Sequence, residues 1–243
     1  VTYVVDGRRA NATVKTRTRA ELKEITSSKP SDEDDAAPSE LRTFRMLDDT
    51  IAYLKPGPFY QAESPANLWD NQAFAALMDA AFELFIKQNA SDLLIDLRSN
   101  PGGDNSFSDL MISWYADRPF RFADTFIVRS SSQAQASNAQ RLKSQSEPNP
   151  VSVKLAEQYA KNPAGTDFEF PIPDSMPRTD QRYAGRVWVL IDRHSYSNAV
   201  SVAAITQDYE FGTVIGESTT DFATTYGAME TFALDRTGFT VGF

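Results

Sequence analysis

The feature that most constrains the fold is an apolar segment that stops at a few polar residues and continues into a helix. Residues 187–191 are Val-Trp-Val-Leu-Ile, and after a polar break an Ala- and Val-rich stretch extends to about Asp208. A sharp turn from strand to helix can hold a serine hydroxyl above free backbone N–H groups, which suits a nucleophile. We interpret Ser197 as the candidate nucleophile. The alternative is that Ser195 or Ser197 only caps the first helical turn.

From residue 47 onward, strand-like and helix-like patterns alternate. The spacing of apolar residues predicts helices at 69–87, 106–115 and 197–208. It predicts strands at 47–54, 92–98, 125–128, 187–191, 213–216 and 231–234. The run 92–98 is apolar with little alternation, which is typical of a strand covered on both faces in a parallel sheet. The sequence therefore predicts an α/β domain with strands buried between helices.

Three other segments have a distinct composition. Residues 1–18 predict two short strands around Asp6-Gly7, and this piece is too small to bury its own apolar face. An acidic stretch centred on residues 31–35 predicts a solvated linker. Residues 130–173 are rich in Ser, Gln, Asn and Pro, with one helical patch at 151–159, and we expect a surface insertion.

A glycine turn follows the strand at 92–98. Asn100-Pro101-Gly102-Gly103 combines a proline that fixes one turn position with glycines that permit a positive φ. Two glycines also let a substrate backbone come close and leave N–H groups unobstructed, as an oxyanion hole requires. An ordinary tight turn is the alternative. The spacing matches neither the phosphate-binding loop nor the dinucleotide-binding pattern.

Composition excludes several classes of function. A net charge of −9 without a basic stripe argues against nucleic-acid binding. The chain has no cysteine and one histidine, His194, so thiol catalysis and Cys- or His-rich metal sites are excluded. We expect neither a metal nor a cofactor. No apolar run approaches the ~20 residues of a membrane-spanning helix.

Taken together, the motifs resemble the catalytic core of the C-terminal-processing (tail-specific) serine protease family, which includes the tricorn core protease. The resemblance lies in residues 95–103, in the Ser197 turn at 197–200, in Gln207-Asp208-Tyr209 and in Gly216-Glu217. It implies a crotonase/ClpP-like α/β core covered by helices at 46–243. It further implies the tail of a PDZ-like domain at 1–25, with the acidic linker at 26–45 between them.

The same resemblance implies an activity and roles for site residues. It implies a serine endopeptidase that hydrolyses peptide bonds through an acyl-enzyme on Ser197. The oxyanion donors would be the amide of Asn198 and that of Gly102 or Gly103. A peptide or protein substrate would bind in extended form beside the sheet edge.

The general base is where the chain departs from the family pattern. In the tail-specific branch a lysine follows the Gly-Glu motif, but Phe222 stands in that place and no lysine occurs after Lys161. The tricorn-like branch takes a histidine and a glutamate from parts of the protein that this chain does not span. We therefore expect a fragment of the tricorn-like branch with its base elsewhere. Within this chain, the remaining candidate for the general base is His194, and the alternative is that His194 is a structural residue. Asp104 and Glu217 are either site carboxylates or exposed and capping residues.

Two other functions remain open from the sequence. The missing base favours a non-catalytic module that binds a peptide or a small ligand on the same fold. A crotonase-like acyl-CoA enzyme would share the oxyanion geometry but would not need a serine at position 197. Because members of the resembling family occur mainly in the cell envelope or are exported, we expect a periplasmic, envelope or secreted protein. The sequence does not specify an oligomeric state.

Overall fold

The computed structural model describes residues 2–5, 8–11, 41–64, 67–144, 150–224, 226–227, 231–234 and 236–242. It divides into two units, Val1–Glu40 and Leu41–Phe243. In the first unit, β1 (Thr2–Val5) and β2 (Arg8–Asn11) pair antiparallel, which confirms the predicted hairpin. Residues 12–40, including most of the predicted linker, lie outside the described residues.

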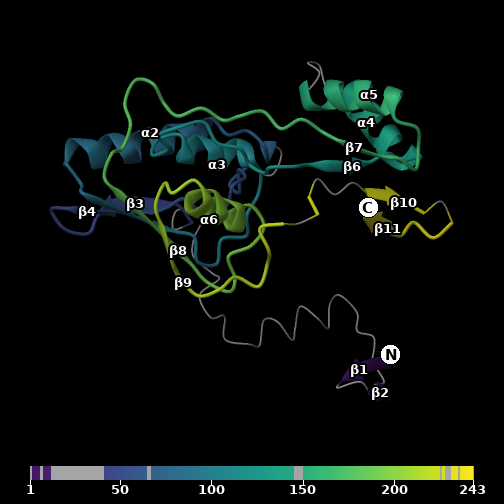
Figure 1. The fold of residues 1–243 in the computed structure, drawn as a ribbon, viewed down its shortest axis with the longest axis horizontal. Coiled ribbons are helices and arrows are strands. Elements are labelled where there is room, and N and C mark those ends of the chain that lie inside the picture. Colours follow the sequence, from purple (N-terminus) through teal and green to yellow (C-terminus); the bar gives the residue numbers. More distant parts are fainter. Residues whose placement is uncertain are drawn as a thin grey trace. The chain divides into compact units, whose positions relative to one another are not determined.

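The second unit is built on a five-stranded sheet with the order β3-β4-β5-β8-β9 (Figure 1). Its strands are β3 (Thr43–Met46), β4 (Ile51–Lys55), β5 (Asp92–Asp96), β8 (Arg186–Ile191) and β9 (Thr213–Gly216). β3 is antiparallel to β4, and the other neighbours are parallel. This mostly parallel sheet confirms the predicted α/β class. Because the carboxyl ends of β5 and β8 lie at one edge, the loops after these two strands are neighbours.

The predicted strand at 47–54 is wrong at its start. Asp48 lies in a turn, where its Oδ1 accepts hydrogen bonds from the N–H groups of Thr50 and Ile51, each at 2.7 Å. An aspartate that bonds backbone amides two and three residues on closes a tight turn. The strand therefore begins at Ile51, and β3 precedes the turn as a separate strand.

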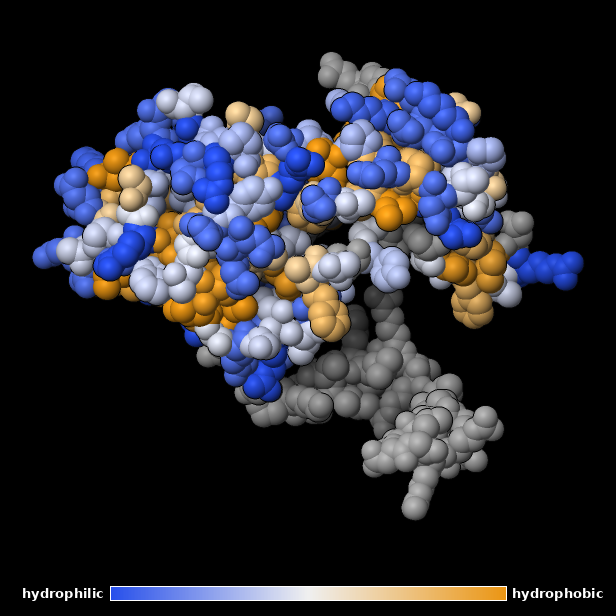
Figure 2. Space-filling view, viewed as in Figure 1, coloured by the Kyte–Doolittle hydropathy of each residue, from blue (hydrophilic) through white to orange (hydrophobic). Residues whose placement is uncertain are grey.

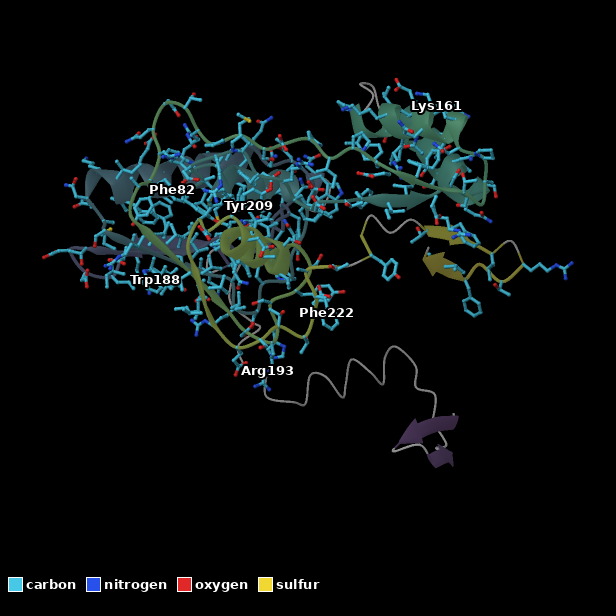
Figure 3. The ribbon with its side chains drawn as sticks, viewed as in Figure 1. Phe82, Lys161, Trp188, Arg193, Tyr209 and Phe222 are labelled. Carbon is cyan, nitrogen blue, oxygen red and sulfur yellow. The ribbon has the colours of Figure 1, made fainter. Side chains whose placement is uncertain are left out.

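Three helices pack on the buried side of the sheet: α2 (Gln72–Lys87), α3 (Asn105–Ile112) and α6 (Asn198–Asp208). Phe82 on α2 stacks on Trp114 with ring centroids 5.1 Å apart, and both side chains are buried in the core. Figure 3 shows Phe82 on the helix side of the sheet and Trp188 on the other side. Along β5, buried and half-buried residues alternate over most of the strand. The described residues therefore cover one face of this strand fully, whereas the sequence predicted that both faces would be covered.

The predicted insertion at 130–173 contains more structure than its one expected helical patch. Its elements are α4 (Ser132–Ser144), α5 (Pro150–Lys161) and β7 (Asp167–Glu169). β6 (Ile127–Arg129), where the sequence predicted a strand at 125–128, directly precedes the insertion. β6 and β7 form a separate antiparallel pair. The buried side chain of Asn138 donates to the carbonyl of Ser152 at 2.8 Å and ties α4 to α5. α4 escaped prediction because it is a polar helix whose partner helix stabilises it.

Late in the sequence, β10 (Thr231–Ala233) pairs antiparallel with β11 (Thr240–Gly242). The predicted strand at 231–234 therefore forms, but it does not belong to the main sheet. Figure 2 shows a mainly hydrophilic surface interrupted by apolar areas. None of the helices in the described part of the chain combines the length and the apolar character that a membrane span requires.

Candidate functional site

Ser197 lies at the junction of β8 and α6 in a strained backbone conformation. Its φ is 52° and its ψ is −122°, and it directly precedes the first residue of α6. A non-glycine residue with such angles costs of order 1–3 kcal/mol and persists only where its surroundings enforce it. Strain of this kind at a strand-to-helix turn is typical of a nucleophile elbow.

The hydroxyl groups of Ser195 and Ser197 do not cap the helix. Ser197 makes no side-chain cap bond, and the buried Ser195 donates its hydroxyl to the carbonyl of Leu97 at 2.7 Å. The N-cap interpretation of this sequence is therefore wrong for both serines. The Ser197 side chain, which is partly exposed, is left without a hydrogen bond in the described residues.

The glycine turn lies directly against Ser197. Gly102 has a φ of +84°, and a Cβ placed on it would meet the Ser197 Cβ and the Asn198 amide nitrogen, each at 2.8 Å. The same Cβ would lie 2.6 Å from the carbonyl oxygen of Tyr196. Only a glycine permits this approach. The structure thus brings together two turns that are far apart in the sequence.

A set of hydrogen bonds holds the loops after β5 and β8 together. The N–H of Leu97 donates to the carbonyl of Leu190 at 2.8 Å, and the N–H of Tyr196 donates to the carbonyl of Asn100 at 2.9 Å. The Ser195–Leu97 bond lies between them. Because these bonds connect the two loops over their whole length, the position of Gly102 relative to Ser197 is determined by the sheet.

Asn100 is the buried centre of the glycine turn. Its side chain donates to the carbonyl of Gly57 at 2.7 Å and accepts from the N–H of Gly102 at 2.9 Å. The Gly102 amide is therefore occupied. Within the described residues no partner is found for the N–H groups of Gly103 and Asn198.

Replacing Asn100 with alanine is expected to destabilise the fold by about 2–5 kcal/mol, because two buried backbone groups lose their partners. Chemical denaturation measures this loss. Asn138→Ala is the matched control, since Asn138 is equally buried but bonds within the insertion. We expect both variants to lose stability and only Asn100→Ala to change the reactivity of Ser197; equal reactivity in both variants would contradict the role of Asn100.

Asp192 and Asp96 anchor the two loops electrostatically. The Oδ1 of Asp192 accepts from the N–H groups of Ser99 and His194, each at 3.0 Å. Partial burial opposes ionisation of Asp192, but these amides outweigh it and lower its pKa. At the end of β5, Asp96 accepts from Arg98 and from the Tyr53 hydroxyl. Burial, and then this bond, raise the pKa of Tyr53 to about 12.

The other candidate residues from the sequence have these positions. His194 is exposed, and its ring has no hydrogen-bond partner in the described part of the chain, so it is paired with neither Ser197 nor a structural neighbour. Asp104 caps α3 by accepting from the N–H of Ser106. Glu217 is exposed and pairs with Arg193, which lowers the pKa of Glu217. The side chain of Asn198 is buried and donates to Ser108 at 2.9 Å, so only its backbone faces the turn.

Asp221 is a site residue that the sequence did not reveal. Its Oδ2 accepts a hydrogen bond from the N–H of Ser197 at 2.7 Å. The only sequence signal was its position beside Phe222, where the resemblance to the tail-specific branch leads one to expect a lysine; Phe222 is 77% exposed. Among the described residues no group of three or more potential metal ligands occurs.

Comparisons with known proteins identify a family and a fold. The model of peptidase family S41 matches residues 51–238. The structure of mature CPAF complexed with lactacystin has a TM-score of 0.55 and 16% identity, over 79% of this chain and 42% of CPAF. A structure from Parabacteroides merdae has a TM-score of 0.53 and 18% identity, over 93% of this chain and 56% of that one.

At these identities the two structures support the fold alone, and this chain spans about half their length. No protein of curated function matches the chain. The family model covers most of the sheet, the glycine turn and the Ser197 turn. The chain therefore belongs to peptidase family S41, a family of serine-type peptidases.

Proposed function

We propose that the chain is the core of a serine endopeptidase in which Ser197 is the nucleophile. The observation that supports this most is the strained Ser197 turn, whose hydroxyl has no capping role and whose backbone packs on Gly102. A hydroxyl held in this way is available for attack on a carbonyl carbon. The substrate is a peptide or protein, as for the family.

The proposed reaction uses these groups as follows. The Ser197 oxygen attacks the scissile carbonyl carbon and loses its proton to a base, and the carbonyl oxygen becomes an oxyanion. The amides of Asn198 and Gly103, which have no partner in the described residues, stabilise this oxyanion. Gly102 is not one of these donors, because its own N–H is bonded to Asn100. Its role is to let the glycine turn approach the Ser197 turn closely. Collapse breaks the C–N bond and expels the amine, which takes the proton from the protonated base. Water, deprotonated by the same base, then hydrolyses the acyl-enzyme, and the Ser197 oxygen recovers its proton.

The general base is proposed to come from outside this chain, as in the tricorn-like branch. Two observations support this. The ring of His194, the only histidine, is not bonded to Ser197, and Phe222 replaces the lysine of the other branch. A histidine oriented by a glutamate would complete the site.

The finer features of the family are part of the same proposal. We propose a crotonase-like core at 46–243, the remnant of a PDZ-like domain at 1–25, and a location in the periplasm, the cell envelope or outside the cell. β9 is the last strand of the sheet, and its outer side has no partner strand among the described residues. An extended substrate backbone beside it would gain main-chain hydrogen bonds.

A non-catalytic binding module is the second candidate. It is favoured by one observation, the absence of any base bonded to the Ser197 hydroxyl in the described residues. Such a module would use the same turns to hold a peptide carbonyl without cleaving the chain.

An active-site fluorophosphonate probe distinguishes the two. We expect covalent labelling of the full-length protein, with mass spectrometry locating the adduct on Ser197 and on no other serine. Prior heat denaturation is the control that must abolish labelling. No adduct, or an adduct on a different residue, contradicts the peptidase and favours the binding module.

A further inference from the structure

Ser197 directly precedes α6, at the N-cap position, but its side chain does not cap this helix. A serine at this position normally accepts an amide hydrogen bond with its own oxygen, and a hydroxyl so engaged is less available for attack. In this chain that bond is absent. The Asp221 carboxylate instead accepts from the N–H of Ser197 at 2.7 Å. Among the described residues it is the only side chain bonded to the Ser197 backbone.

The loop that contains Asp221 is attached to the Ser197 turn at several points. The N–H of Glu217 donates to the carbonyl of Ile191 at 3.1 Å. The Thr220 hydroxyl donates to the carbonyl of Arg193 at 2.8 Å, and Arg193 and Glu217 form two hydrogen bonds of 3.1 Å. Asp221 follows these contacts directly, so its carboxylate is delivered to Ser197 by a loop with little freedom.

The surroundings of this loop also place it at the candidate site. Asp221 and Phe222 line a groove together with Val200 and Ala203 of α6, and Figure 3 shows Phe222 near that helix. The loop thus borders the nucleophile on the side where α6 begins.

We infer that Asp221 is a positioning residue that holds the strained Ser197 turn and leaves the nucleophile hydroxyl free. This inference rests on the proposed function of Ser197. A hydrogen bond to a charged acceptor is about twice as strong as one between neutral groups, and the negative charge also suits the positive end of α6. Asp221 acts through the backbone, because its partner is the Ser197 N–H and not the hydroxyl. It is therefore distinct from the general base.

The test compares two replacements of Asp221 in the full-length protein. Asp221→Ala removes the acceptor, and we expect fluorophosphonate labelling of Ser197 to slow by at least about 10-fold at saturating probe. Asp221→Asn keeps an acceptor oxygen and removes the charge that lies near the forming oxyanion. We expect it to label within about threefold of the parent protein or faster. Asp49→Ala, which removes an exposed carboxylate from the β3–β4 turn, is the control with the same loss of charge.

A second measurement does not depend on activity. Hydrogen exchange of the Ser197 amide, followed by NMR, should be at least about 10-fold faster in Asp221→Ala than in the parent and in Asp221→Asn. Unchanged exchange in Asp221→Ala overturns the inference, whatever the labelling. If the parent protein does not label but the exchange pattern holds, the proposed peptidase fails and Asp221 still holds the turn. If the parent labels and Asp221→Ala labels equally fast, the peptidase stands and the inference fails.

Discussion

In the full-length protein, Ser197→Ala is expected to lower peptide hydrolysis by about 10⁶-fold, which is the loss that follows removal of the nucleophile in a well-studied serine protease. The reason is chemical, because no acyl-enzyme can form without the oxygen. The fold should be unaffected. The Ser197 hydroxyl has no hydrogen bond in the described residues, and the partly exposed turn is held by backbone contacts that alanine retains.

Turnover of a fluorogenic peptide and the melting temperature, measured on the same preparations, check this prediction. Ser132→Ala is the control, because it deletes an exposed hydroxyl on α4. We expect full turnover in the control and background turnover in Ser197→Ala, with equal melting temperatures. Hydrolysis that persists in Ser197→Ala would assign the activity to another residue.

Gly102→Ala is the second variant with a large expected effect. The new Cβ would lie 2.6 Å from the Tyr196 carbonyl oxygen and 2.8 Å from the Asn198 nitrogen, so the two turns must move apart. A displacement of about 1 Å at a reacting centre costs about 10²-fold, and loss of an oxyanion donor costs about 10²–10³-fold. We therefore expect turnover of the full-length protein to fall by at least about 10²-fold.

Gly165→Ala separates this steric effect from backbone strain. Gly165 has a φ of +94°, close to the +84° of Gly102, but a Cβ placed on it meets nothing within 4 Å. Both variants bear the cost of a left-handed alanine, roughly 1–2 kcal/mol in denaturation experiments. Only Gly102→Ala should lose turnover and probe labelling. Equal losses in the two variants would show that strain, and not contact with the Ser197 turn, explains the result.

Local patterns were sufficient for the elements that build the site. The apolar run at 187–191, the small residues after Asn198 and the short strand at 213–216 predicted β8, α6 and β9 almost to the residue. Parallel order followed from the alternation of strands and helices. Prediction failed where the stabilising partner is distant, as for the polar helix α4, which packs on α5 through Asn138.

The site itself was predicted in part. The resemblance to the protease family implied that Ser197 and one of Gly102 or Gly103 share a site, and the structure places Gly102 in contact with Ser197. Asp221 was not expected, because an aspartate in a polar loop has no periodicity or motif that distinguishes it. Its position depends on how the loop after β9 is attached to Arg193 and Ile191.

By itself the sequence determined which chemical groups are present and which local segments form strands, helices and tight turns, because these follow from neighbouring residues. Only the tertiary structure decided that Ser197 is strained, that its hydroxyl is free and that Asp221 holds its amide. The physical reason is distance along the chain. The bonds that enforce this geometry join residues far apart, as Ser195 and Leu97, 98 positions from each other, illustrate.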